Sequence, residues 1–135
     1  MRIPDGAPGW TLGSTVDIED VRRLALRLPE AYEQASYDDR PSWRTRPRMF
    51  AIVGDDPRKL TVWVASLEEK EALLGSDPSV FSTIAHHDGH PIVLVDLDTI
   101  DPDEAAELIT DSWRLRAPKR AVAAWDRVGG ADEGS

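Results

Sequence analysis

The stretch SWRTRPRMFAIVGDDPRKLTVWVA, residues 42–65, decides the fold class. Its aromatic and β-branched residues fall into short runs that are separated by Pro47 and by the turn sequence GDDP at residues 54–57. A similar run at residues 32–37 precedes them. Runs of this composition, divided by turn residues, are typical of consecutive antiparallel strands. Because proline cannot donate a ladder hydrogen bond, we expect residues 43–48 at a sheet edge or in a sharp turn.

Helices are expected on both sides of these strands. Apolar residues at helical spacing predict a first helix that Ser14 or Thr15 caps and that ends at Leu28, before Pro29. The capping-box sequence SLEE at residues 66–69 begins a short helix that Gly75 should terminate. Residues 80–87 and 91–97 predict a hairpin across Asp88-Gly89. Two further helices are expected, one after Asp101-Pro102 and one from Pro118 to about residue 128.

This order of elements predicts an α+β fold, with an antiparallel sheet of about five to six strands and helices packed on one face. With 135 residues, 41% of them hydrophobic, the chain suits one domain, which we place at residues 14–128. Residues 1–13, rich in proline and glycine, are expected to be a flexible lead-in, and residues 129–135 a disordered tail. Trp63 and Trp113 are expected in the core, and Trp10 outside it.

The composition restricts the possible functions. The chain has no cysteine, which excludes disulfides, cysteine metal sites and cysteine nucleophiles. Its longest strictly aliphatic run, residues 92–95, is far too short to cross a bilayer, so we expect a cytoplasmic protein with no membrane partner. We find no glycine-rich phosphate loop, no serine and histidine at a motif-like spacing, and no distinct carboxylate pair. The sequence therefore predicts a non-enzymatic protein without a cofactor.

The main functional indication is the segregation of charge. The net charge is −9, yet half of the 16 cations lie in two stretches without an acid, residues 40–48 and 114–120. Brought together by folding, these stretches would form a basic patch for the phosphate backbone of DNA or for another phosphate-bearing partner. The candidate residues of this patch are Trp43, Arg44, Arg46, Arg48, Arg114, Arg116, Lys119 and Arg120, with Trp43 placed to stack on a base.

Structural explanations compete with each of these assignments. Cations near a helix end complement the helix dipole and pair with acids of the same helix, and charges on an edge strand prevent aggregation. His86, His87 and His90 suggest a metal site, but adjacent strand residues point to opposite faces, so we expect an exposed hairpin tip and no metal. The acidic group Asp17, Glu19 and Asp20 could attract cations, although Glu19 and Arg23 are spaced to pair.

Four segments carry a resemblance to a known family. They are LRLPEAYEQASY at residues 26–37, RPRMFAIVG at 46–54, PIVLVDLD at 91–98 and, most specifically, DSWRLRAPKR at 111–120. In this order they resemble the MmcQ/YjbR-like family over roughly residues 15–125. The resemblance implies a fold similar to bacterial frataxin (CyaY-like), with strands likened to the double-wing surface of a DNA-binding transcription factor, and it implies DNA binding.

Three functions thus stay open at the level of sequence. The first is DNA or phosphate binding through the basic patch, without sequence-specific reading. The second is a protein-interaction or small-ligand module that uses the sheet face. The third is cation binding of the frataxin type on the acidic first helix.

Overall fold

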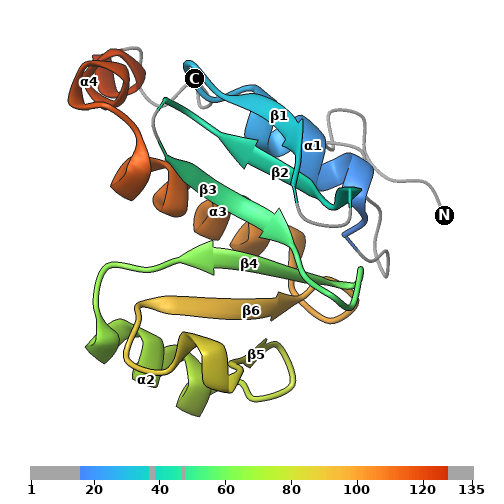
Figure 1. The fold of residues 1–135 in the computed structure, drawn as a ribbon. Helices are drawn as coiled ribbons and strands as arrows, with labels where there is room; N and C mark the ends of the chain where they lie inside the picture. Colours follow the sequence, from blue (N-terminus) through green and yellow to red (C-terminus); the bar gives the residue numbers. More distant parts are fainter. Residues whose placement is uncertain (1–15, 37–38, 47, 128–135) are drawn as a thin grey trace, which may run out of the picture.

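The structure is a computed structural model that describes residues 16–36, 39–46 and 48–127, so the expected lead-in and tail lie outside the described residues. A six-stranded sheet, entirely antiparallel, has the strand order β1-β2-β3-β4-β6-β5 (Figure 1). The strands are β1 (Tyr32–Ala35), β2 (Pro41–Arg44), β3 (Met49–Val53), β4 (Lys59–Trp63), β5 (Phe81–Ser82) and β6 (Ile92–Asp96). The helices are α1 (Ile18–Leu26), α2 (Leu67–Ser76), the short 3₁₀ helix η2 (Ala85–His87), α3 (Pro102–Arg116) and α4 (Lys119–Arg127). The predicted α+β class is confirmed.

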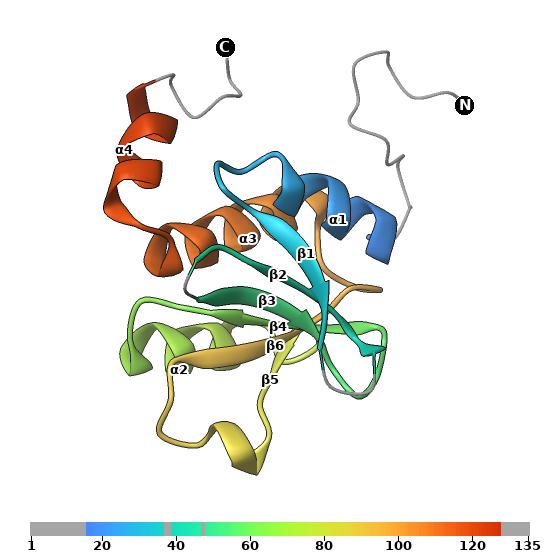
Figure 2. The same cartoon turned by 45° about the horizontal axis from the view of Figure 1, so that its top comes forward.

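Helices α1 and α3 cover one face of the sheet (Figure 2). The core lies between them and a row of small and branched side chains that are paired across three strands, Ala51, Val62 and Val93. Trp113 of α3 is fully buried in this core, as expected from the sequence, and its ring contacts that of Trp125 edge-on at 5.8 Å between centroids. Through this contact α4 packs against the C-terminal end of α3. No described helix is long and apolar enough to cross a membrane.

The helix starts follow local capping rules. The side chain of Asp17 accepts a hydrogen bond from the Asp20 amide at 2.9 Å, so α1 begins later than the Ser14 or Thr15 cap that we expected, both of which lie outside the described residues. The helix ends at Leu26, two residues before the predicted end. Ser66 caps α2 as predicted, and α2 continues past Gly75 to Ser76.

The predicted antiparallel pairing of residues 80–87 with residues 91–97 is confirmed at Phe81 and Ser82, but the predicted turn across Asp88-Gly89 is wrong. Strand β5 has only two residues, and the connection to β6 contains η2. The buried ammonium of Lys70 in α2 donates to the carbonyls of His87 at 2.7 Å and His90 at 2.9 Å. The same carbonyls accept backbone hydrogen bonds from the His90 and Ile92 amides at 3.0 and 2.8 Å, so Lys70 adds a tie from α2 to a connection, residues 83–91, that is already bonded within itself.

Strand β3 contains a β-bulge in its pairing with β2. Trp43 faces Ala51, but Arg44 faces Met49, so Phe50 is the extra residue, and it turns into the core beside Ala51. The pairing of β3 with β4 runs from Val53 only as far as Ala51. Beyond that point the Ser112 hydroxyl of α3 bridges the strands: it accepts from the Trp63 amide at 2.9 Å and donates to the Phe50 carbonyl at 2.6 Å.

We expect Ser112→Ala to lower the free energy of unfolding by about 1–3 kcal/mol, because both backbone groups would then be buried without a partner. Ser76→Ala is the matched control, since the Ser76 hydroxyl is exposed and donates only within its own helix. Urea denaturation of the two variants measures the difference. Equal stability of both variants would show that the bridge contributes nothing.

Candidate functional site: the open face of the sheet

The sheet face opposite α1 and α3 is hollowed. A cavity of about 690 Å³ opens on it, and a second of about 310 Å³ shares part of its lining and continues beside β5. We call this surface the open-face groove. The groove is lined by Arg40, Met49, Ile52, Asp55, Thr61, Trp63, Ile84, His86, His87, His90 and Ile92, and the smaller cavity adds Gly54, Asp56, Lys59, Ser82, Thr83 and Leu94.

Apolar side chains from neighbouring strands form the groove floor. Ile52 faces Thr61 and Trp63 faces Ile92 in the antiparallel register, so these side chains share one face of the sheet. Ile52 is only 8% exposed, although it does not belong to the core on the helix side. A sequence signal for this existed: β3 and β6 are near-continuous apolar runs, which is typical of strands covered on both faces.

The connection with the three histidines forms one wall of the groove. It projects from the sheet on the side away from α1 and α3 (Figure 2). His86 and His87 lie on one turn of η2, with ring centroids 5.6 Å apart, so the strand alternation on which we had based the exposed hairpin tip does not apply. His87 is half-buried, and its Nδ1 is buried without a hydrogen-bond partner among the described residues. Burial lowers the pKa of His87 below its ordinary value.

Within the described part of the chain, no group of three or more histidine or acidic side chains is placed to hold a metal ion. The acidic residues of α1 have local partners instead. Asp17 and Asp20 cap the helix start reciprocally, Asp20 also pairs with Arg23, and Glu19 pairs with Arg22 at 2.5 Å. The side-chain oxygens that would serve a frataxin-like cation site are thus engaged in capping and ion pairs.

Three of the eight predicted site residues, Arg44, Arg48 and Arg116, lie next to Met49 and Trp63 at one end of the groove, which we call the cationic end, and Arg46 belongs to the turn between Arg44 and Arg48. Arg44 faces Met49 across β2 and β3 and so shares the open face with it. The turn after β2 closes with a 2.8 Å hydrogen bond from the Thr45 amide to the Arg48 carbonyl. None of the four cations forms an ion pair with a described residue.

Arg116 comes to this end from the helix side of the sheet. It follows Ser112 by one helical turn, so both point to the place where β3 and β4 separate. Its Nε donates to the Met49 carbonyl at 2.9 Å, and its guanidinium lies 4.4 Å from the centroid of the Trp63 ring. Burial, and then the nearby Arg48, lower the pKa of Arg116.

The other predicted site residues are not at the cationic end. Arg114 pairs with Asp126 at 2.7 Å and Arg120 with Glu30 at 3.1 Å, and Lys119 is exposed at the start of α4. The expected stacking role of Trp43 is wrong: Trp43 is fully buried, and its indole donates to Glu33 at 3.1 Å. Of the two alternatives predicted for residues 43–48, the sharp turn is confirmed by the hydrogen bond from Thr45 to Arg48, and the sheet edge is wrong because β2 pairs with both β1 and β3. Trp63, which we expected in the core, is instead half-buried on the open face.

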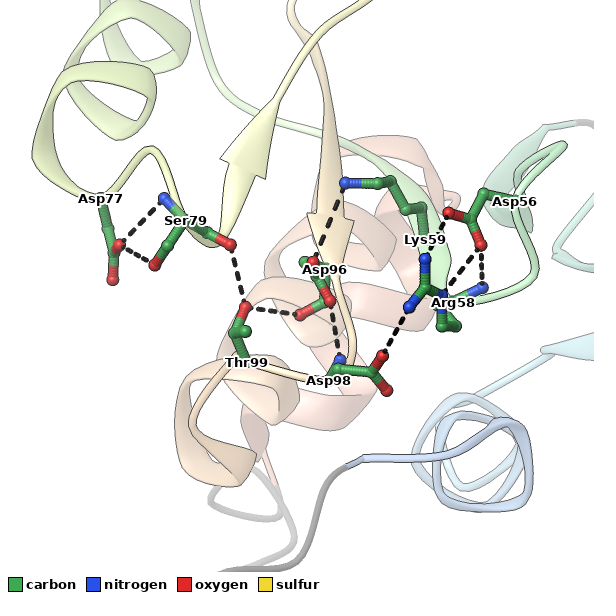
Figure 3. Close-up of polar contacts among 8 residues, drawn as sticks. All are labelled: Asp56, Arg58, Lys59, Asp77, Ser79, Asp96, Asp98 and Thr99. Atoms are coloured by element: carbon green, nitrogen blue, oxygen red, sulfur yellow. Dashed lines mark hydrogen bonds and ion pairs between the residues drawn. The ribbon is translucent and has the colours of Figure 1, made fainter.

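The opposite end of the groove, near Asp55 and Asp56, contains carboxylates as well as cations. Its cations are all paired: Arg40 with Asp55 at 3.2 Å, Lys59 with Asp96 at 3.9 Å, and Arg58 with Asp56 and Asp98 at 3.2 and 3.4 Å. Figure 3 shows the ion pairs of Arg58 and Lys59 beside the end of β6, where the Thr99 hydroxyl donates to the Ser79 carbonyl and links the residues before α3 to those before β5. The groove therefore has one neutralised end and one end with unpaired positive charge.

Comparison with known proteins places this chain in a family. A family model described as YjbR matches residues 26–115, and the chain belongs to this family. The uncharacterized proteins Rv2570 and MT2646 of Mycobacterium tuberculosis and Mb2600 of Mycobacterium bovis are each 33% identical over 120 residues, which is 79% of this chain and 93% of each relative.

One solved structure shows the same fold. It is the crystal structure of Deinococcus radiodurans protein DR2400, with a domain of the DUF419 family model. It is 24% identical, with a TM-score of 0.67, and the match covers 87% of this chain and 91% of that one. The CyaY-like and double-wing arrangement that the resemblance implies stays a prediction.

The buried position of His87 generates a pH prediction. Because its folded pKa lies below the ordinary 6.5, the unfolded chain binds a proton at His87 more readily as the pH falls through 6.5. The folded state should thus lose stability on acidification in this range, and His87→Gln should lose less. Denaturation at pH 7.5 and 5.0 tests this, and an NMR titration of His87 with a midpoint at or above 6.5 would contradict it.

Proposed function

We propose that this protein is a non-enzymatic binding module that holds a small amphipathic ligand in the open-face groove. The observation that carries the proposal is the groove itself, a hollow of about 690 Å³ with Met49, Ile52, Trp63 and Ile92 on its floor. Ligand sites typically enclose about 300–1,000 Å³ and combine an apolar lining with a few polar groups. The groove is open to solvent, but its volume lies in this range and its lining combines apolar and polar groups, and its floor faces away from the folding core.

The energetics of the floor support this proposal. Apolar surface removed from water contributes about 25 cal/mol per Å², so a ligand that covers the floor gains free energy without rearranging the core. Trp63 offers a large, rigid surface, and Ile84 extends the apolar lining from the wall, where it is 46% exposed. Lys70 of α2 anchors the wall, because its ammonium donates hydrogen bonds to the carbonyls of His87 and His90.

A second candidate function is binding of the DNA backbone through the cationic end. The specific observation that favours it is that Arg44, Arg48 and Arg116 lie close together, with Arg46 in the same turn, and that none of the four has a carboxylate partner among the described residues. Arg114 and Arg120 would add little, because each already neutralises an acid. Such binding would be electrostatic and would not read sequence.

The first proposal predicts that Ile84→Ser weakens binding of anilinonaphthalene sulfonate, an apolar fluorescent probe, about fivefold, because it removes a partly buried contact. Leu26→Ser is the matched control: Leu26 is 41% exposed on α1, on the other side of the sheet. Fluorescence titration gives both affinities. Equal loss in both variants, or no binding by the parent protein, would refute the assignment of the groove.

The second candidate predicts that the log–log salt slope of DNA affinity is about −3.6 for four phosphate contacts, at about −0.9 for each. Replacing Arg44, Arg46 and Arg48 with glutamine should reduce the slope to about −0.9, whereas Arg114→Gln with Arg120→Gln should leave it nearly unchanged. Fluorescence anisotropy with a labelled duplex at several salt concentrations measures this. Absence of binding at low salt would remove DNA as a candidate.

A further inference from the structure

We propose that the cationic end of the open-face groove is a subsite for a phosphate monoester, carried by a small ligand whose apolar part lies on the groove floor. This inference rests on the proposed small-ligand function and specifies the chemistry of its ligand. Arg116 and Arg48 would hold the phosphate, with Arg44 beside them on the same face.

Arg116 is held in place before any ligand arrives. One of its donors, Nε, is fixed by the Met49 carbonyl, and its planar group packs on the ring of Trp63. Its four terminal N–H groups have no hydrogen-bond partner among the described residues. A guanidinium with fixed orientation and free terminal donors matches the oxygens of a phosphate, because two parallel hydrogen bonds can form at once.

Arg116 and Arg48 have no negative charge beside them among the described residues. Arg48 lies close enough to Arg116 for the two positive charges to repel, and Arg116 is also partly removed from water. The ordinary solution for a half-buried arginine is a carboxylate, as Arg22 has in Glu33 at 2.6 Å. No described carboxylate takes that place beside Arg116. An anion bound between Arg116 and Arg48 would offset both the repulsion and the loss of hydration.

Charge and shape favour a monoester on a small molecule. A phosphate monoester carries a charge of about −1.5 to −2 at pH 7, which suits several guanidinium groups better than a single carboxylate does. Beyond the cationic end the groove floor of Met49, Ile52, Trp63 and Ile92 is apolar, and the groove finishes at Asp55, whose side chain is 96% exposed. A continuous polyanion that follows the groove would cross the apolar floor and meet this carboxylate, whereas a terminal phosphate would not.

Calorimetry with three probes tests the proposal: 1-naphthyl phosphate, the neutral 1-naphthol, and a single-stranded oligonucleotide without terminal phosphates. We expect the parent protein to bind naphthyl phosphate at least tenfold more tightly than naphthol. Arg48→Gln should remove about tenfold of this affinity and leave naphthol binding unchanged, because Arg48 is exposed and does not support the floor. Arg120→Gln, an exposed arginine outside the groove, is the matched control and should change neither affinity.

The outcomes separate this inference from the function on which it rests. Equal affinity for naphthyl phosphate and naphthol, or no effect of Arg48→Gln, overturns the subsite and leaves the apolar groove standing. Failure of all three probes overturns both. An oligonucleotide that binds as tightly as naphthyl phosphate, with the same loss in Arg48→Gln, overturns the monoester in favour of the DNA backbone. Arg116→Lys keeps the charge but loses the planar pair of donors, so it should lose more affinity for naphthyl phosphate than for naphthol, and an equal loss for both probes would contradict a phosphate contact at Arg116.

Discussion

The hydroxyl of Ser112 is the contact on which the site depends. It sits just beyond the Ala51–Val62 pair, where the pairing of β3 with β4 ends beside the bulge at Phe50, and its two hydrogen bonds join the two strands there. These bonds hold the Ser112 side of α3 against β3 and β4. Because residues four apart share a helix face, Arg116 then points through the same opening toward Met49 and Trp63. A cation from the helix layer thereby reaches the opposite face of the sheet.

The sheet separates two kinds of apolar surface. One face forms the folding core with α1 and α3, and the other carries the groove floor of Met49, Ile52, Trp63 and Ile92. Stability of the fold needs only the first, so the second is available for a ligand. The connection from β5 to β6, held by Lys70, raises a wall beside this floor and turns a flat sheet face into a hollow.

Charge is distributed unevenly along this groove, although the chain as a whole is acidic with a net charge of −9. At the end near Asp55 and Asp56, every cation is paired with a carboxylate. At the other end Arg44, Arg48 and Arg116 have no such partner among the described residues. The surrounding negative charge repels long polyanions at a distance, while the local cations attract a compact anion within about a screening length of 10 Å.

Local patterns in the sequence determined the strands at residues 42–65, the Ser66 cap of α2 and the α+β class, because each depends on neighbouring residues and on the order of the elements. The tertiary structure decided which cations meet. Arg116 joins Arg44 and Arg48 through the bulge and the Ser112 bridge, while Arg114 and Arg120 find acids elsewhere. Spacing along the chain cannot reveal this, since a bulge reverses which side chains share a face. Likewise, only folding showed that Trp43 is buried and that Trp63 lines the groove, because burial depends on what covers a strand.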